Sequence, residues 1–252
     1  MRIIFILFLF IASLSADTQK VYLYTTEINI NNFKSLKVGF DAYLRKHGNY
    51  EFQPFNDKKI FEEYLKENDA IVILSSWHYL KIAEKYNLKA VSVAQKKGSI
   101  YDTKILVGQI GASLNGVVTS AYDKEYANDI LNVITAGKAA DLSVLLVPKE
   151  IDALMSVGFG MSKFALVSKD SFSALQDINP MLAKNLTIYS ESKPQYRMLL
   201  TYNKDNDKKN DLISILRDMY SSNEGKNILN MIGIDGWSKL SKDDLADLGG
   251  MK

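Results

Sequence analysis

Small polar and aromatic residues stand directly after several predicted β-strands, where an α/β protein binds its ligands. The junctions are, in chain order, Thr25, Thr26 and Glu27; Ser75, Ser76, Trp77, His78 and Tyr79; residues 111–116; and Ser168, Lys169, Asp170 and Ser171. Ligands of open α/β sheets lie beyond the carboxyl ends of strands, and the N–H groups of a following helix favour anions and polar groups. The pattern predicts non-covalent binding of a small polar or anionic solute.

Each junction also has a purely structural interpretation. A serine that precedes a helix commonly caps it, which would account for Ser75 or Ser76. Trp77 could pack in the core as readily as line a ligand site. A histidine in the position of His78 is more often a surface residue than a binding residue. Residues 111–116, GASLNG, fit a glycine-rich turn as well as a loop that lets a ligand approach the backbone. The binding hypothesis depends on the junctions occurring together in one chain.

The hypothesis assigns a specific set of residues to one ligand site. They are Thr25, Thr26, Ser76, Trp77, His78, Tyr101, Ser113, Asn115, Gly116 and Ser168. Thr25 and Ser76 follow parallel strands of a first lobe, so they emerge at one edge of its sheet. We expect residues 113–116 to follow the equivalent strand of a second lobe and to donate hydrogen bonds across a cleft. Trp77 and Tyr101 are expected to form the apolar walls of that cleft.

The sequence carries no motif for covalent, metal or cofactor chemistry. It has two histidines, His47 and His78, and no cysteine, so neither a zinc-ligand pattern nor a disulfide is present. The glycines of 158–160 follow a predicted helix, whereas the glycines of a dinucleotide-binding motif follow a strand. The Gly-Lys pairs at 137–138 and 225–226 lack the upstream glycine and the following Ser or Thr of a phosphate-binding loop. There is no nucleophile elbow. We expect a binding protein rather than an enzyme, with no catalytic residue, metal or cofactor.

The first sixteen residues have the layout of a secretory signal peptide. Arg2 provides a positive charge, residues 3–11 are an apolar run, and small residues dominate 12–16. A membrane-spanning helix would need about 20 apolar residues. We therefore expect a cleaved signal and a soluble protein held in the periplasm. The formal net charge of +2 gives no reason to expect nucleic acid or an anionic membrane as a partner.

Short apolar runs alternate with amphipathic stretches along the rest of the chain. Predicted strands cover 21–24, 70–74, 90–93, 104–110, 143–147, 164–168 and 197–202. Predicted helices cover 33–45, 60–65, 77–86, 126–134, 149–157 and 212–220, with a last helix capped by Asn223. This alternation predicts an α/β protein with mainly parallel sheets. Polar stretches at 96–103 and 190–195 suggest that the chain leaves a first lobe, builds a second and returns.

Several segments match a known family in layout. They are the helix end DAYL at 41–44, the segment ENDAIVILSSWHY at 67–79, Tyr101 in 98–101, and GKNILNMIGIDGW at 225–237. With these segments the chain resembles a type 2 periplasmic substrate-binding protein, of the phosphate/phosphite/phosphonate branch of ABC-transporter receptors. One segment departs from that branch. The family has a hydroxyl-rich S-T-S-G loop, whereas the matching segment of this chain is Ser113-Leu114-Asn115-Gly116. This segment lacks two of the hydroxyl donors that would bind a tetrahedral oxyanion.

The resemblance implies two lobes, each a mainly parallel sheet flanked by helices, joined by two crossing strands. Lobe 1 would comprise 17–103 and 197–252, and lobe 2 would comprise 104–196. It also implies a monomer that captures a small polar or anionic solute, phosphonate-like or another oxyanion, and delivers it to an ABC-transporter permease in the inner membrane. The alternative function is a periplasmic sensor that presents its bound state to a histidine kinase or another membrane partner.

Overall fold

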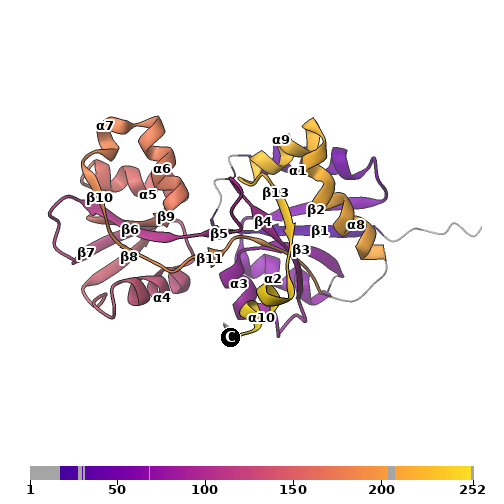
Figure 1. The fold of residues 1–252 in the computed structure, drawn as a ribbon, viewed down its shortest axis with the longest axis horizontal. Coiled ribbons are helices and arrows are strands. Elements are labelled where there is room, and N and C mark those ends of the chain that lie inside the picture. The colour runs from indigo at the N-terminus through magenta and orange to yellow at the C-terminus, as the bar shows by residue number, and fades with distance from the viewer. Residues whose placement is uncertain (1–17, 28–29, 31, 68, 204–207, 251–252) are drawn as a thin grey trace, which may run out of the picture.

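Two β-sheets, each covered by helices on both faces, form the two lobes of the molecule (Figure 1). The computed structural model describes residues 18–250 except 28–29, 31, 68 and 204–207. The predicted signal peptide, 1–16, lies outside the described residues. No helix within the described ranges is long and apolar enough to cross a membrane.

Lobe 1 is built on a six-stranded sheet with the order β13-β4-β12-β3-β1-β2. Its strands are β1 (Gln19–Tyr24), β2 (Tyr50–Phe55), β3 (Ala70–Leu74), β4 (Lys89–Gln95), β12 (Leu199–Tyr202) and β13 (Gly236–Lys239). Its helices are α1 (Phe33–Leu44), α2 (Lys58–Glu67), α3 (Ser76–Ile82), α8 (Lys208–Arg217), the short 3₁₀ helix η1 (Asp218–Ser221), α9 (Asn223–Met231) and α10 (Lys242–Gly250).

Alternating side chains explain why helices cover both faces of this sheet. Along β1, Val21 and Leu23 point to one face and pack in the core beneath α1, α8 and α9. Tyr22 and Tyr24 point to the other face, toward α2 and α3. Successive side chains of a strand alternate between faces, so a strand with apolar residues at every position must be covered on both.

Lobe 2 is built on a five-stranded sheet with the order β10-β6-β9-β7-β8. Its strands are β6 (Lys104–Gln109), β7 (Gly116–Ser120), β8 (Leu142–Leu146), β9 (Phe164–Ser168) and β10 (Leu186–Glu191). Its helices are α4 (Lys124–Ile134), α5 (Glu150–Gly158), α6 (Lys169–Ile178) and α7 (Pro180–Ala183). Residues of α5, α6 and α7 share one core with the sheet, and residues of α4 share the core on the opposite face.

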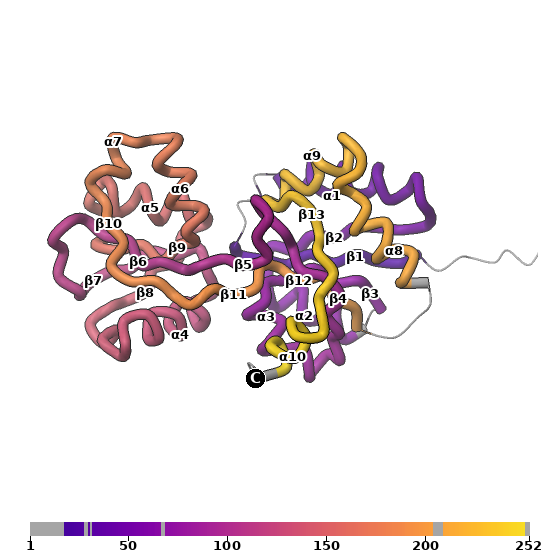
Figure 2. The backbone as a smooth tube through the Cα atoms, in the orientation of Figure 1, coloured from indigo at the N-terminus to yellow at the C-terminus, as the bar shows by residue number. Residues whose placement is uncertain are grey.

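The chain crosses between the lobes twice, through two short strands that pair with each other. β5 (Tyr101–Asp102) carries it into lobe 2, and β11 (Gln195–Tyr196) carries it back. The two strands are antiparallel, with Tyr101 opposite Tyr196. Figure 2 shows both crossing segments running side by side between the lobes. The α/β fold with two lobes and two crossing strands, predicted from the sequence, is confirmed.

Each sheet is mixed, whereas the sequence predicts mainly parallel sheets. β1 is parallel to β2 and β3, but β12 runs antiparallel to both of its neighbours, β3 and β4. In lobe 2, β6 runs antiparallel to β9 and β10. β6 and β12 directly follow the crossing segments, so each enters its sheet in the reverse direction, and β13 also pairs antiparallel with β4.

Residues 111–116, one of the junctions after predicted strands, do not lead into a helix. Gly111 has φ +80° and Gly116 has φ +100°, so both adopt a left-handed conformation that suits glycine. The segment is a turn that leads into β7, a strand missing from the sequence-based prediction. The cap of α9 is also displaced by one residue: Ser222, not Asn223, accepts a hydrogen bond from Gly225 N, at 3.0 Å.

Candidate functional site

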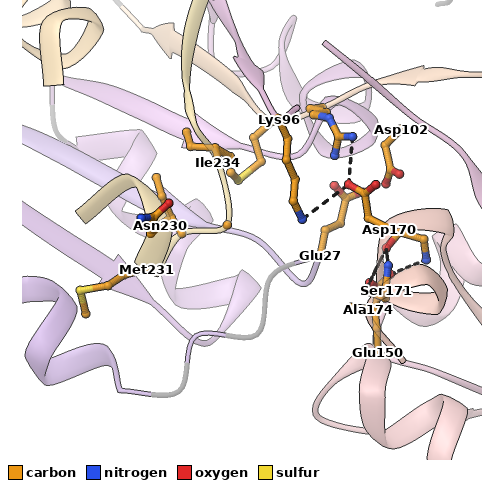
Figure 3. Close-up of a pocket in the computed structure, with 15 residues that line it drawn as sticks. Glu27, Lys96, Asp102, Glu150, Asp170, Ser171, Ala174, Asn230, Met231 and Ile234 are labelled. Carbon is orange, nitrogen blue, oxygen red and sulfur yellow. Dashed lines mark hydrogen bonds and ion pairs between the residues drawn. The ribbon is translucent and has the colours of Figure 1, made fainter. Parts of the chain in front are cut away.

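A cavity of about 270 Å³ lies between the lobes, and we call it the interlobe cavity. Lobe 1 contributes Glu27, Lys96, Met198 and the segment 230–234, lobe 2 contributes Glu150, Ser168, Asp170, Ser171 and Ala174, and the crossing segments contribute Asp102 and Arg197. Figure 3 shows Lys96, Glu27 and Asp170 pointing toward one another across the gap. Movement of one lobe against the other would change the shape of this cavity, because both lobes line it.

The turn after β1 places Glu27 in the cavity. The Thr25 hydroxyl accepts a hydrogen bond from Glu27 N, at 3.1 Å, and lies 3.0 Å from the Ser75 hydroxyl at the end of β3. Thr25 is itself buried, so its side chain ties the two strand ends together instead of facing a ligand. The neighbouring Thr26 hydroxyl is buried without a hydrogen-bond partner among the described residues.

A buried lysine links the lobes at the base of the cavity. Lys104, the first residue of β6, places its Nζ 2.7 Å from Asp102 Oδ2 and 3.4 Å from Glu27 Oε1. The same ammonium lies 4.9 Å from the centre of the Tyr122 ring. Burial alone would lower the pKa of Lys104, but the Asp102 and Glu27 carboxylates raise it well above its ordinary value. Lys104 is therefore a permanent positive charge between the lobes.

Lys104 affects its two carboxylate partners differently. Burial raises the pKa of both, but for Asp102 the Lys104 ammonium, together with Arg197 and a hydrogen bond from Thr103 N, outweighs burial and the net pKa is lowered. For Glu27 burial outweighs the more distant ammonium, and the net pKa is raised. Asp102 is thus the firm partner of Lys104, while the Glu27 carboxylate is less completely neutralised.

The Glu150 carboxylate is held by a set of neutral donors. Its Oε1 accepts hydrogen bonds from the Tyr122 hydroxyl and from Ser168 N, the latter at 2.8 Å. Its Oε2 accepts hydrogen bonds from the Ser168 hydroxyl, at 2.6 Å, and from the Ser171 hydroxyl. Ser168 is the N-cap of α6, so these groups lie at the N-terminal end of that helix. Glu150 itself is buried and begins α5.

Ion pairs join the lobes at the edge of the cavity. Asp170 Oδ2, from the first turn of α6, lies 3.0 Å from Arg197 Nη2 and 3.5 Å from Lys96 Nζ. Figure 3 marks the contact between Lys96 and Asp170 with a dashed line. Lys96 belongs to lobe 1 and Arg197 to the returning segment, so Asp170 of lobe 2 forms ion pairs with two separate parts of the chain. Both cationic side chains that line the cavity are therefore paired with the Asp170 carboxylate.

The lobes also touch through helices α2, α3 and α4. The Trp77 ring stacks on the Tyr126 ring, with centroids 4.7 Å apart and planes at 9°. Lys58 Nζ lies 3.0 Å from Asp123 Oδ2, the carboxylate that caps α4. Trp77 is buried and packs in the apolar core of lobe 2, although it belongs to lobe 1. This contact fixes the relative position of the lobes next to the cavity.

Of the residues that the sequence predicts for the site, Ser168 alone is among those lining the interlobe cavity. Ser76 instead donates a hydrogen bond to the carbonyl of Tyr196, on the returning strand β11. His78 is buried in lobe 1, with its Nε2 3.2 Å from Glu62 Oε1. These side chains support the crossing point and the core of lobe 1.

The expected aromatic walls lie elsewhere. Trp77 is covered by Tyr126, as described above, and does not line the cavity. The Tyr101 ring packs against the Tyr196 ring at a tilt of 41°, with centroids 4.9 Å apart, and Tyr101 lines an adjoining groove with Lys97 and Pro194. Polar and charged groups therefore dominate the cavity, and its apolar lining comes from residues such as Met198 and Ile234.

The prediction that residues 113–116 face Ser76 across the cleft is wrong. β6 runs away from lobe 1, starting at Lys104, and the 113–116 turn follows its far end (Figure 1). There Ser113 and Gly116 line a separate pocket with residues 160–163, and Asn115 Oδ1 accepts a hydrogen bond from Lys163 Nζ. The end of lobe 2 that meets lobe 1 carries the junction between β7 and α4 instead, with Asp123 as the cap.

The sequence-based prediction missed the charged residues of the cavity: Glu27, Lys96, Asp102, Glu150, Asp170 and Arg197. A signal existed for some of them. Glu27 and Asp170 belong to predicted strand-to-helix junctions, yet the hydroxyl residues beside them were preferred. Asp102 and Arg197 have no local signal, because only the pairing of β5 with β11 brings them to one place.

The sheet orders, the shared cavity and the paired crossing strands define a type 2 periplasmic-binding-protein fold. Known structures have the same fold. XAC2383 from Xanthomonas citri, solved bound to ATP, is 12% identical with a TM-score of 0.70, over 92% of this chain and 96% of that one. PhnD1 from Prochlorococcus marinus, solved with methylphosphonate, is 11% identical with a TM-score of 0.70, over 93% and 96%.

A third similar structure is the binding protein component of an ABC phosphonate transporter, PA3383 from Pseudomonas aeruginosa. It is 12% identical with a TM-score of 0.66, over 92% of this chain and 85% of that one. No protein-family model matches the chain, and no curated protein matches it. At these identities the likeness shows the fold alone, so the ligand must be argued from the side chains of this chain.

Proposed function

We propose that this protein is an exported solute-binding protein that captures a small polar solute in the interlobe cavity and delivers it to an ABC transporter. The observation that carries the proposal is the cavity itself, which both lobes and both crossing segments line. Charged and hydroxyl groups from separate segments converge there, as in sites that bind small polar molecules. The predicted signal peptide supports a periplasmic location, with a permease in the inner membrane as partner.

The paired crossing strands supply a hinge for this function. A solute that contacts Glu27 in lobe 1 and Ser171 in lobe 2 stabilises the arrangement in which the lobes are close together. A transporter can then recognise the solute-loaded protein by the relative position of its lobes. Micromolar affinity needs only about 8 kcal/mol, which a few charge-assisted hydrogen bonds can supply.

Thermal-shift screening of the mature chain, residues 17–252, tests the proposal. The panel comprises small oxyanions, amines, amino acids and neutral sugars, and each hit is measured by isothermal titration calorimetry. We expect at least one solute to raise the Tm and to bind with a stoichiometry of one. Stabilisation by no member of the panel would overturn the proposal.

Two variants locate the binding of any hit. Glu27→Gln changes a cavity residue, and we expect it to weaken binding. Asn115→Ala changes a polar residue that contacts Lys163 at the far pocket of lobe 2, so we expect wild-type affinity. Equal losses in both variants would contradict the assignment of binding to the interlobe cavity.

A further inference from the structure

The Glu150 carboxylate occupies a position where a helix N-terminus would otherwise hold an external anion. Ser168 N and the Ser168 and Ser171 hydroxyls converge on it from the N-terminal end of α6, and the Tyr122 hydroxyl adds a fourth donor. Helix N-termini and convergent hydroxyls are the donors that bind phosphate-like groups in proteins. Here a buried side chain of the protein accepts all of these hydrogen bonds.

The N-terminus of α4, which also lies at the lobe interface, is occupied in the same way. Asp123 caps α4, and its Oδ1 accepts hydrogen bonds from Glu125 N, at 3.0 Å, and from Tyr126 N, at 3.4 Å. Its Oδ2 pairs with Lys58 across the interface. The N-termini of α4 and α6 therefore already hold a carboxylate of the chain.

The remaining charges of the cavity also disfavour an anion. Its lining carboxylates are Glu27, Asp102, Glu150 and Asp170, and its lining cations are Lys96 and Arg197. Both cations pair with Asp170, and Lys104 pairs with Asp102 and Glu27. The hydrogen bonds to Glu150 come from neutral groups. These four carboxylates outnumber the three cations that pair among them, so the charges around the cavity would repel an oxyanion and attract a cation.

We propose that Glu150 determines the specificity of the interlobe cavity: its carboxylate fills the anion subsite, so the bound solute presents an ammonium or guanidinium group and not an oxyanion. The inference rests on the proposed function and names the class of its solute. It replaces the phosphonate-like solute that the sequence predicts with a cationic one. Glu150 faces the cavity beside Ser171 and Ala174, where it supplies negative charge to the solute (Figure 3).

Calorimetric titration of the mature wild-type protein at neutral pH with two sets of probes tests this inference. The oxyanions are inorganic phosphate, sulfate and methylphosphonate, and the cations are putrescine, L-lysine and L-arginine. We expect at least one cation to bind and no oxyanion to bind. Wild-type binding of an oxyanion in the cavity would overturn the inference while leaving the proposed solute-binding function intact.

Variants of Glu150 test the role of its carboxylate. In Glu150→Ala the donors around α6 are free, and we expect at least a tenfold gain in affinity for phosphate and at least a tenfold loss for the cation. Glu150→Gln keeps the side-chain size and removes the charge, so it should lose cation affinity without a comparable gain for phosphate. Glu191→Ala removes an exposed carboxylate of lobe 2 and should change neither affinity.

The outcomes separate the inference from the function on which it rests. Unchanged cation affinity in a folded Glu150→Gln protein, checked by circular dichroism, would overturn the role of Glu150. If both Glu150 variants fail to fold, the wild-type titrations still decide between cation and oxyanion. Binding of neutral sugars alone would overturn the inference, and binding of no probe of any class would overturn the proposed function.

Discussion

At the scale of single residues, the carboxylates of the cavity differ in how firmly they stay charged. Asp102 is held ionised by Lys104 at 2.7 Å. Burial raises the pKa of Glu27, and the nearby carboxylates of Asp102 and Glu150 raise it further. The Lys104 ammonium lowers this pKa, but by less than burial raises it. Glu27 therefore takes up a proton at a higher pH than an ordinary glutamate.

Binding of a cationic solute should therefore weaken on acidification at pH values above those expected for an ordinary glutamate. The raised pKa of Glu27 means that it takes up a proton as the pH falls, and the cavity loses one negative charge. Affinity measured by calorimetry between pH 8 and pH 5 should fall steadily in the wild type. Glu27→Gln should bind roughly 10–100-fold more weakly at neutral pH, as expected for a lost charged hydrogen bond, with a flatter pH profile. An identical profile in that variant would contradict the role of Glu27.

His78 predicts a second pH effect, this time on stability. Burial lowers the pKa of His78 despite its hydrogen bond to Glu62, so the folded protein favours the neutral ring. Its folded-state pKa lies below the unfolded value of about 6.5, so its contribution to stability is present above that pH and is lost as the pH falls below it. We expect the Tm to decrease between pH 7 and pH 5.5.

A pair of histidine variants tests this effect. His78→Phe keeps a ring against Tyr24 and Phe61 and should show a smaller decrease in Tm over the same pH range. His47→Phe changes the other, exposed histidine and should behave as the wild type. A wild-type slope in His78→Phe would assign the acid sensitivity to other groups.

The sequence predicted which loops lie at the site better than it predicted which side chains of those loops line the cavity. The turn after β1 was found, but Thr25 bonds within the fold, and it is Glu27 that lines the cavity. Which side chain turns outward depends on the Thr25 contact with Ser75, fifty residues away in the chain. Local residue types carry no information about that contact.

At the scale of elements, strands buried on both faces were predicted best. The boundaries of β3 (Ala70–Leu74) and β9 (Phe164–Ser168) agree with the sequence-based ranges, because every side chain in them is buried and apolar or small. β2 (Tyr50–Phe55) was missed. It lies at the edge of its sheet and contains Pro54, and proline within a strand is tolerated mainly at edges.

The packing of α9 against η1 gives a prediction at this scale. A Cβ on Gly225 would lie 2.0 Å from the Met219 carbonyl oxygen, which is backbone and has little freedom to move. Gly225→Ala should therefore reduce the free energy of unfolding by about 1–3 kcal/mol, the usual cost of overpacking. The measurement is the midpoint of urea unfolding, followed by circular dichroism.

Gly249→Ala is the matched control for this substitution. Gly249 also lies in a helix, α10, and a Cβ there would meet nothing within 4 Å. Alanine has the higher helix propensity, so this variant should be as stable as the wild type or more stable by up to about 1 kcal/mol. Similar losses in both variants would contradict the steric explanation for Gly225.

At the scale of the whole molecule, the α/β class and the two-lobed architecture were accessible from the sequence, but the contacts between lobes were not. Alternation of apolar and amphipathic stretches and the resemblance in layout predicted the fold. The stacking of Trp77 on Tyr126 depends on the mutual orientation of two separately folded sheets. No periodicity in either segment encodes that orientation.

The Trp77–Tyr126 stack leads to a last prediction, about the distance between the lobes. Removal of the ring in Trp77→Ala eliminates a buried aromatic pair that joins lobe 1 to the core of lobe 2. Such a pair contributes about 0.5–1.5 kcal/mol beyond its buried area, so arrangements with separated lobes should become more populated. Small-angle X-ray scattering of the solute-free variant should show a larger radius of gyration. Its solute affinity should fall, because binding must then drive the closure as well.

Trp237 provides the control, since the chain has two tryptophans and Trp237 packs within the core of lobe 1. Trp237→Phe should change stability without changing the radius of gyration. It also leaves Trp77 as the only tryptophan, so its fluorescence reports the interlobe contact directly. Solute binding that restores the wild-type radius of gyration in Trp77→Ala would show that the solute and the aromatic stack stabilise the same arrangement of the lobes. An unchanged radius and unchanged affinity in Trp77→Ala would show that the stack does not control that arrangement.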